Sequence, residues 1–270
     1  MNMMRFTTMK TKLRKYPSIF LILLLAISSC FLTGCVNQHP KDSKKSSQGE
    51  SVETMLEITD PKEKQAVLNA KAKVKALSGN PRIVATSPAV ADICDKLDLD
   101  LVGVPKSSVS KIPSRYKKVK KVGLAMSPDM EIVSSLNPDW ILAPSSLETD
   151  LKPKFEELKN TEYAFLNLRS VQGMYRSAQE LGEIFGKQQE AEKMTKEFTT
   201  FYKSYTKRNK NKKHPKVLVL MGLPGSYVIA TENSYIGSLV KLAGGENVYQ
   251  NTDQEFLTVN TEDMKKKEPD

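Results

Sequence analysis

The three cysteines carry the most reactive side chains of this 270-residue sequence, and their positions limit their chemistry. Cys30 lies near the end of an N-terminal segment that is first basic and then apolar, and Cys35 follows that segment. Its first 16 residues hold five cations and no acid, and its apolar run, from Ile19 to Leu32, is short for a bilayer span. This pattern predicts a signal peptide over 1–34. Cys94 lies in a helical pattern, which favours a buried structural thiol over a reactive one.

The four residues Leu32-Thr33-Gly34-Cys35 place small residues directly before a cysteine. This motif resembles the lipobox of bacterial lipoproteins. The resemblance implies that Cys35 becomes the first mature residue and carries lipid on its thiol and amino groups, on the extracellular face of the cell membrane. A plain signal peptide or an uncleaved anchor is the alternative. If Cys35 is acylated, Cys94 is the single remaining thiol and the mature chain has no internal disulfide.

Composition and charge exclude several classes of protein. The formal net charge is +10, but five cations precede Cys35, so 36 cations against 31 acids, or +5, remain after maturation. Basic and aromatic residues do not interleave, which argues against nucleic acid as a partner. The two histidines, His39 and His214, are too few for a nitrogen-rich divalent-metal site. The segment from Gly222 to Ser226 does not fit the Gly-x-Ser-x-Gly elbow of exported hydrolases, so we expect no enzyme.

The first part of the mature chain, 35–80, is predicted to combine a tether with one helix. Residues 36–52 are mainly polar and cannot bury enough apolar surface to fold. Asp60-Pro61-Lys62-Glu63 supplies a capping residue, a proline for the first helical position and an acid for the first turn. Apolar residues then recur on one face up to Leu77, which predicts a helix over 61–77 that packs on the next domain or acts as a spacer.

The following segments alternate between strand and helix patterns. For 81–169 the patterns predict strands at 82–86, 101–104, 140–143 and 163–166 and helices at 88–97, 129–136 and 151–158. This alternation is typical of an α/β lobe with a mostly parallel sheet. A long helix is expected from about 170 to 207, within a connecting segment 170–213, and Gly182 and Gly186 are candidates for bending it. A second α/β pattern, with strands at 217–221 and 227–230 and a helix at 235–243, occupies 214–270.

The two α/β segments match each other. Pro81-Arg82-Ile83-Val84 corresponds to Pro215-Lys216-Val217-Leu218, and in both segments a glutamate stands eight residues before the aspartate of a Pro-Asp pair, Asp139 or Asp270. In the first segment this pair leads into a strand. We therefore expect the second lobe to be incomplete and the chain to be truncated. Coincidental similarity of two short segments is the alternative.

Three stretches of sequence carry a resemblance to a known family: Gly123 to Pro128, His214 to Tyr227, and Ser234 to Val248. Together with the lipobox and the two lobes, they resemble the class III binding proteins of ABC importers for iron-siderophores, vitamin B12 and haem. The closer similarity is to the haem-binding lipoproteins of the iron-regulated surface determinant (Isd) type in Gram-positive bacteria. The similarity covers about 81–270. It implies an α/β fold of two Rossmann-like lobes joined by a long backbone helix.

The resemblance also implies which residues bind ligand. In the family a methionine from the first lobe and a histidine from the second hold the haem iron. Here the methionine is Met126, and a thioether suits haem iron. The family's histidine would lie beyond Asp270, and we expect both His39 and His214 to be solvated surface residues. The resemblance points to two groups for the haem propionates, the start of a helix and a loop, formed by Ser87, Ala89 and Val90 and by Ser108, Val109 and Ser110. A simple helix cap is the alternative for Ser87 and does not exclude the other role.

Two glutamates are expected to face the permease. By resemblance Glu131 and Glu262 dock on permease arginines, although an acid near a helix start also complements the helix dipole. The resemblance implies a membrane-anchored receptor that takes haem b from upstream cell-wall relay proteins and delivers it to an ABC permease, without catalysis. A receptor for an iron-siderophore or another iron complex is the alternative.

Overall fold

The structure is a computed structural model that describes residues 5–6, 52–258 and 260–270. The described residues belong to one compact unit. Cys30, Cys35 and His39 lie outside these ranges, as do the predicted signal peptide, lipobox and tether apart from Arg5–Phe6 and Val52. No helix in the described ranges combines the length and apolar character that crossing a bilayer requires.

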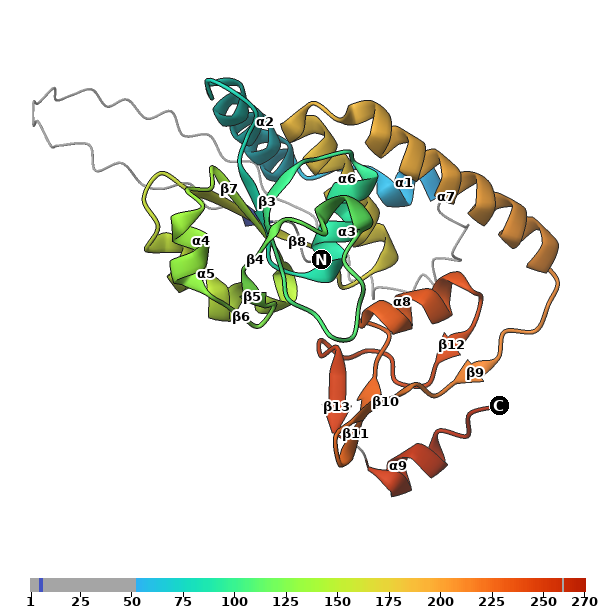
Figure 1. Cartoon of the computed structure of the whole chain (residues 1–270). Helices are drawn as coiled ribbons and strands as arrows, with labels where there is room; N and C mark the ends of the chain where they lie inside the picture. The colour runs from blue at the N-terminus through green and yellow to red at the C-terminus, as the bar shows by residue number, and fades with distance from the viewer. Residues whose placement is uncertain (1–4, 7–51, 259) are drawn as a thin grey trace, which may run out of the picture. The chain divides into compact units, whose positions relative to one another are not determined.

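The main sheet has five parallel strands and an antiparallel edge strand among the described residues. Its order is β1-β8-β7-β2-β3-β4, and in Figure 1 β7 and β8 lie beside each other. The parallel strands are β2 (Ile83–Ala85), β3 (Leu101–Val104), β4 (Lys120–Lys121), β7 (Trp140–Pro144) and β8 (Glu162–Leu166). β1 (Arg5–Phe6) pairs with β8, with Arg5 opposite Phe165. β2, β7 and β8 bury nearly every residue, because helices cover both faces of a parallel sheet.

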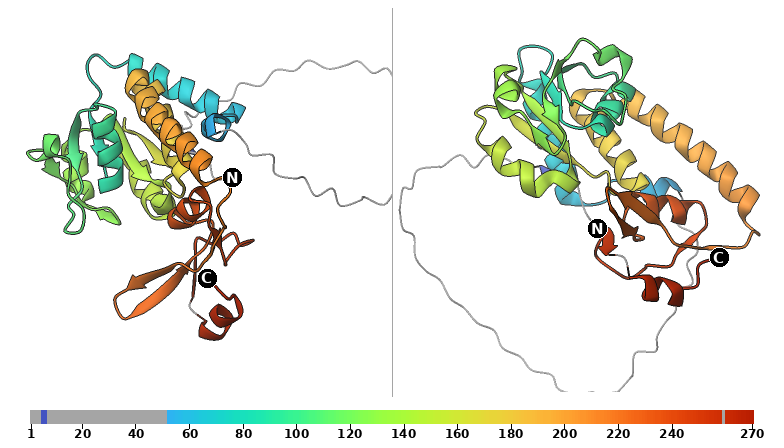
Figure 2. Two further views of the ribbon diagram at one scale, coloured as in Figure 1. Left: turned by 90° about the vertical axis from the view of Figure 1, so that its right-hand side faces the viewer. Right: turned by 60° about the horizontal axis from the view of Figure 1, so that its bottom comes forward.

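Helices pack on both faces of this sheet and bury one apolar cluster on each. The first cluster joins the sheet to α2 (Pro61–Lys75), α3 (Pro88–Lys96), α6 (Val171–Phe185) and α7 (Gln188–Asn209). The second joins the other face to α4 (Met130–Ser135) and α5 (Glu148–Glu156). Figure 2 shows this three-layer arrangement. The parallel α/β lobe expected from the sequence is therefore confirmed.

The predicted long helix from 170 to 207 is wrong in one respect, because it is two helices. α6 ends where Gly186 adopts a left-handed conformation, with φ 69°, and α7 begins at Gln188. At Gly182 a Cβ would come within 2.7 Å of Ala191 Cβ, so this glycine allows α6 and α7 to approach closely. Gly186 therefore ends α6, and Gly182 allows α6 and α7 to pack closely.

The remaining elements agree with the predicted types, with shifted bounds. The helix expected over 61–77 is α2, and Asp60 caps it by accepting from Lys62 N. The helix expected over 151–158 is α5, which starts three residues earlier. The strand expected over 217–221 is interrupted, and its residues belong to β9 (Lys216–Val217) and β10 (Leu220–Leu223). The short helix α1 (Val52–Leu56) begins in the last residue of the expected tether.

Residues 214–258 form two small sheets and a helix. β10, β11 (Ser226–Ala230) and β13 (Phe256–Thr258) make an antiparallel sheet, and β9 pairs in parallel with β12 (Glu246–Asn247). α8 (Tyr235–Leu242) begins at the cap Ser234. The side chain of Ser238 accepts from Val171 N at 3.1 Å, which ties α8 to the start of α6.

The internal repeat expected from the sequence is confirmed by matching hydrogen bonds. In the first copy Arg82 N donates to Asp139 Oδ2 at 2.7 Å, and Asp139 N donates to Arg82 O at 2.9 Å. In the second copy Lys216 N donates to Asp270 Oδ2 at 2.8 Å, and Asp270 N donates to Lys216 O at 3.0 Å. Coincidence does not explain two Pro-Asp pairs that close the same reciprocal contact.

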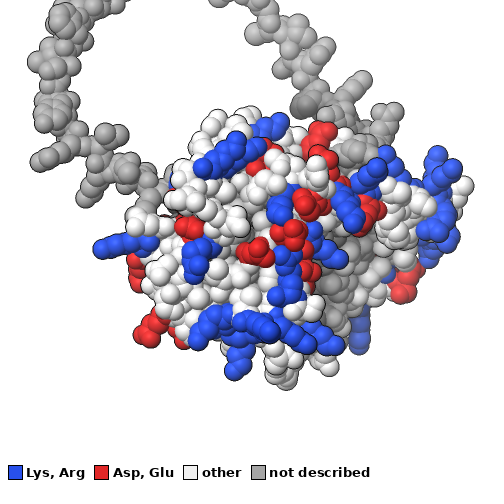
Figure 3. All heavy atoms as spheres, turned by 45° about the horizontal axis from the view of Figure 1, so that its top comes forward, with Lys and Arg blue, Asp and Glu red and all other residues white. Residues whose placement is uncertain are grey.

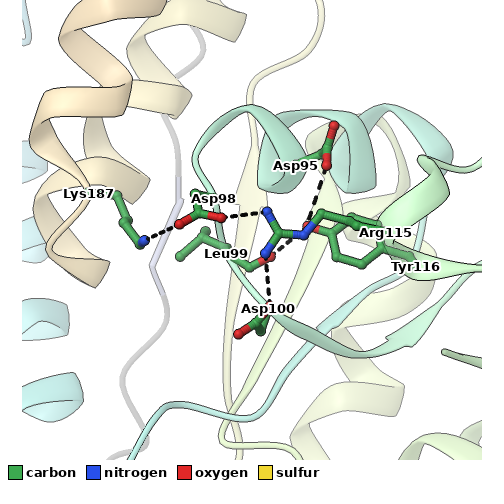
Figure 4. A network of polar contacts seen from close by, with 7 residues as sticks. All are labelled: Asp95, Asp98, Leu99, Asp100, Arg115, Tyr116 and Lys187. Atoms are coloured by element: carbon green, nitrogen blue, oxygen red, sulfur yellow. Dashed lines mark hydrogen bonds and ion pairs between the residues drawn. The ribbon is translucent and has the colours of Figure 1, made fainter. Parts of the chain in front are cut away.

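A network of charges joins α3, β3 and the corner between α6 and α7 (Figure 4). The Arg115 guanidinium donates to Asp98 at 2.7 Å and to Asp100 at 2.8 Å, and Lys187 Nζ donates to Asp98 at 2.9 Å. The Lys187 and Arg115 cations lower the pKa of Asp98. The adjacent Tyr116 hydroxyl donates to the buried Leu99 carbonyl at 2.6 Å. These contacts hold the turn between α3 and β3 against the start of α7.

Candidate functional site

The candidate site lies at the carboxyl ends of β2, β3 and β4. Because these strands are parallel and adjacent, the segments that follow them emerge at the same edge of the sheet. β2 leads into the cap of α3, β3 leads into the loop 105–113, and β4 leads into a hairpin of β5 (Gly123–Leu124) and β6 (Ser127–Pro128). The sequence-predicted ligand residues of the first lobe occupy these three segments.

Met126 lies in the two-residue turn of the β5–β6 hairpin. Leu124 pairs with Ser127, which leaves Ala125 and Met126 between the strands, and the Met126 side chain is 74% exposed. Leu124, beside it, is 58% exposed. An exposed thioether at a hairpin tip is free to donate its sulfur lone pair to a ligand, whereas most methionines pack in a core.

Backbone contacts hold the base of this hairpin to the sheet. Val122 N donates to Val104 O at 2.9 Å, and Lys106 N donates to Gly123 O at 2.6 Å. Asp129 N donates to Val122 O at 2.7 Å, which places the hairpin directly before α4. Gly123 has φ 96°, and a Cβ on it would come within 2.9 Å of Asp129 N. Glycine is therefore required where the chain turns out of the sheet.

The helix start and the loop expected to bind carboxylates both point backbone amides at a serine oxygen. The buried Ser87 side chain accepts from Val90 N at 3.2 Å and caps α3, while Ala89 is exposed. In the loop after β3, Ser107 Oγ accepts from Val109 N at 3.3 Å and from Ser110 N at 3.0 Å. A ligand carboxylate at either place would compete with a serine side chain for the same donors.

Ser107 is a residue that the sequence reasoning missed. The resemblance led to 108–110, whereas the structure shows that the oxygen that gathers these amides belongs to the preceding residue. The sequence signal for Ser107 is its position three residues before Ser110, because Ser side chains commonly accept from backbone N–H groups two or three residues ahead. Ser108 and Ser110 are exposed, and Val109 is 95% exposed.

Glu131 and Glu262 occupy equivalent positions in the two copies of the repeat. Asp129 caps α4 by accepting from Glu131 N at 3.1 Å, and Asn260 caps α9 (Thr261–Lys266) by accepting from Glu262 N at 3.1 Å. Both glutamates are exposed, and Glu262 pairs with Lys266 at 3.0 Å one turn later. Either acid complements the dipole of its helix and remains accessible to a partner.

His214 is exposed, as expected for a surface residue. Its Nδ1 lies 2.7 Å from Gly244 O, a contact that occupies one ring nitrogen. Among the described residues, no three His, Cys, Asp or Glu side chains gather closely enough to share a metal ion. Within that part of the chain, Met126 is the one sequence-predicted iron ligand that the structure places at an exposed loop tip.

Comparison with known protein families decides the family. A family model described as "Periplasmic binding protein" matches residues 83–270, which is more than two thirds of the chain. The chain belongs to the periplasmic binding protein family. Members of this family are binding proteins, and the α/β fold of the class III type expected from the sequence is the fold of its structural neighbours.

Individual relatives are similar over most of the same region. "High-affinity heme uptake system protein IsdE" of Staphylococcus aureus (strain Newman) is 41% identical over 194 residues, which are 72% of this chain and 66% of that protein. The chain thus spans just under two thirds of the length of this curated relative. The crystal structure of S. aureus IsdE complexed with heme is 40% identical, with TM-score 0.66, over 71% of this chain and 74% of that one. An ABC transporter substrate-binding protein from Listeria monocytogenes EGD-e is 46% identical, with TM-score 0.66, over 71% and 73%.

Proposed function

We propose that the protein is a haem receptor that delivers haem, as an iron source, to an ABC permease. The observation that carries the proposal is the exposed Met126 thioether at the carboxyl edge of a parallel sheet. A relative named for heme uptake and a similar structure solved in complex with heme support it. Haem is the cargo of such a receptor, and the protein does not transform it chemically.

In this proposal Met126 gives its sulfur to one axial position of the haem iron. A thioether is soft and neutral, so it binds haem iron without the cost of burying a charge. Exposed Leu124 would contact the porphyrin beside it. The propionates would replace the serine oxygens at the amides of Val90, Val109 and Ser110, and one of them would also accept from Ala89 N, because N–H groups at a helix start favour an anion.

A titration with ferric haem tests the iron ligand. The purified protein should shift the Soret band of haem, and Met126→Ala should change the absorption spectrum and raise the haem off-rate, because one axial bond is lost. Met221→Ala is the matched control, since Met221 is also exposed, at 39%, but lies on β10 outside the site. Identical spectra and off-rates for the parent and Met126→Ala would refute Met126 as the ligand.

The alternative is a receptor for an iron-siderophore or another iron complex. Solved siderophore-binding proteins share the fold at about 20% identity, which supports the architecture but not the cargo. Saturation of the protein by a ferric siderophore, with no Soret shift on addition of haem, would favour this alternative. The Met126 variant would then bind the siderophore like the parent.

We further propose that the protein works at the outer face of the cell membrane, anchored through lipid on Cys35, with residues 1–34 removed as a signal peptide. The support is the sequence Leu32-Thr33-Gly34-Cys35 after a basic and apolar segment. Cys35→Ala should release the protein into the medium or leave the precursor unprocessed. A Cys35→Ala protein that is processed and retained like the parent would contradict the proposal.

The division of the mature chain follows the same proposal. A tether and helical segment over 35–80 would lead into a first lobe over 81–169, a connecting segment over 170–213 and a partial second lobe over 214–270. Limited proteolysis of the purified protein tests these boundaries, since exposed connections between lobes are cut before strands and helices. First cuts inside β7 or α6 would contradict them.

The exposed Glu131 and Glu262 are candidates for contacts with the permease. We propose that Glu131 and Glu262 dock on cationic side chains of the permease, because the repeat places both at the second position of a capped helix. Cell-wall haem-relay proteins would supply the cargo. Glu131→Lys combined with Glu262→Lys should abolish haem-dependent growth while haem binding in solution is unchanged. Normal growth of that double variant would refute the docking role.

A further inference from the structure

The segment that contains the candidate site has an excess of basic residues. Residues 101–128 hold seven cations and no acid, although the chain as a whole has 31 acids. Arg115 is the one cation of this segment that binds acids among the described residues, through the network of Figure 4. The other six are exposed lysines, and none of them forms an ion pair with another described residue: Lys106, Lys111, Lys117, Lys118, Lys120 and Lys121.

Four of these lysines lie on the segments that form the site. Lys120 and Lys121 form β4, the strand that leads into the Met126 hairpin, and Lys121 is the register partner of Val104. The backbone of Lys106 bonds to Gly123 at the hairpin base, at 2.6 Å. Lys111 follows Ser110, whose backbone N–H donates to Ser107 Oγ. We call Lys106, Lys111, Lys120 and Lys121 the lysine rim.

We propose that the lysine rim steers an anionic ligand, a tetrapyrrole with two carboxylates, into the site. This inference rests on the proposed function and deepens it, because it adds residues that act before the ligand contacts Met126. Unpaired cations on one side of a site raise the local concentration of an anion and its association rate. Screening by salt limits their range to about 8 Å at physiological ionic strength, so cations next to the site matter most.

Charge is unevenly distributed over the face of the molecule in Figure 3. In Figure 3, Lys and Arg side chains form a band along the lower margin of the face shown, whereas cations and acids are mixed over its middle. A uniform excess of lysine would attract anions to the whole surface. Where cations and acids are mixed, their opposite potentials largely cancel beyond a Debye length. Steering therefore depends on the basic regions that lack acids, and residues 101–128 form such a region in the sequence.

Protection of the sheet edge is another role for part of the rim. β4 is the last strand of the sheet, and lysines on an edge strand prevent pairing with another chain. This role explains Lys120 and Lys121, which are on the strand. It does not explain Lys106 and Lys111, which are in the loop after β3. The two roles can be separated by experiment. Loss of edge protection should increase aggregation, whereas loss of steering should lower the association rate of the ligand.

The test compares two variants with the same change in net charge. The rim variant carries Lys106→Gln, Lys111→Gln, Lys120→Gln and Lys121→Gln. The control variant carries Lys207→Gln, Arg208→Gln, Lys210→Gln and Lys212→Gln, four exposed cations at the end of α7 and just after it. Stopped-flow absorbance measures the association of haemin with the parent and with each variant between low and physiological salt.

At low salt the rim variant should associate about tenfold more slowly than the parent, and its rate should no longer fall as salt is added. The control variant should keep the rate and salt dependence of the parent. The final spectrum and the dissociation rate should be the same in all three, because steering acts before the iron bond forms. Haemin dimethyl ester, which lacks both carboxylate charges, should not associate more slowly with the rim variant than with the parent.

Three results would overturn the steering proposal: equal slowing in both variants, a parental rate in the rim variant, or slowing of the dimethyl ester by the rim substitutions. If the rim variant aggregates, the double variant Lys106→Gln with Lys111→Gln, which leaves β4 unchanged, should still slow association by severalfold. A parental rate there would overturn the proposal as well. If the parent binds haemin with a Met126-dependent spectrum, the proposed function survives the failure of steering. If it binds none, both fail.

Discussion

Glu180 is the group whose substitution should change the stability of this protein most clearly. It lies on α6, fully buried, next to the buried Glu63 of α2, and its two carboxyl oxygens have no hydrogen-bond partner among the described residues. Burial first, and then the neighbouring Glu63 carboxyl, raise the pKa of Glu180 from an ordinary 4.5 to about 10. The folded protein therefore keeps Glu180 protonated at neutral pH.

The sign and size of the pH effect follow from this pKa. Above pH 4.5 the unfolded chain releases the Glu180 proton, whereas the folded chain holds it up to about pH 10. The free energy of unfolding therefore falls as pH rises through this interval, by about 1.4 kcal/mol per pH unit. By pH 7 the loss amounts to roughly 3 kcal/mol, a large part of the stability of an ordinary domain.

Glu180→Gln removes the titration and keeps the shape of the side chain. Near pH 5 the variant should be about as stable as the parent or slightly less, because the new amide is also without partners. Towards pH 9 it should become the more stable of the two. Urea unfolding at pH 5, 7 and 9 measures the difference. Glu183→Gln is the control, because the pKa of Glu183 is lowered by its contact with Lys71 and its contribution is lost only in acid.

Parallel pH dependence of the parent and Glu180→Gln would refute this reasoning. It would mean that the carboxyl of Glu180 titrates at the same pH in the folded and unfolded chains.

Two further substitution or labelling experiments test other parts of the structure. Gly123→Ala should lower the free energy of unfolding by about 1–3 kcal/mol in urea titrations, because φ 96° and the approach to Asp129 N both oppose a Cβ. Gly79→Ala is the control and should be neutral or stabilising, because no atom lies within 4 Å of the added Cβ. Equal effects of the two substitutions would contradict this reasoning. Burial raises the pKa of the Cys94 thiol to about 12, so iodoacetamide at pH 8 should alkylate Cys94 ~10³-fold more slowly in the folded protein than in urea, as peptide mass spectrometry can measure. Rapid labelling of the folded chain would show that Cys94 is accessible.

The sequence alone identified the types of most elements and the internal repeat. Local patterns were sufficient where the decisive contacts lie within one element or its cap, as in α2, where Asp60 accepts from Lys62 N two residues away. The two Pro-Asp pairs were also recognisable, since each copy repeats the same short pattern around the same reciprocal hydrogen bonds. Family resemblance, not periodicity, pointed to Met126.

Only the tertiary structure decided features that join distant residues. It separated α6 from α7, since packing at Gly182 and the left-handed Gly186 favour a corner over a continuous helix. It brought Glu63 beside Glu180 and gathered the amides of the loop after β3 on Ser107. The physical reason is that helix and strand preferences depend on neighbours in sequence, whereas burial, loop approach and shared charges depend on packing between segments that sequence separation does not specify.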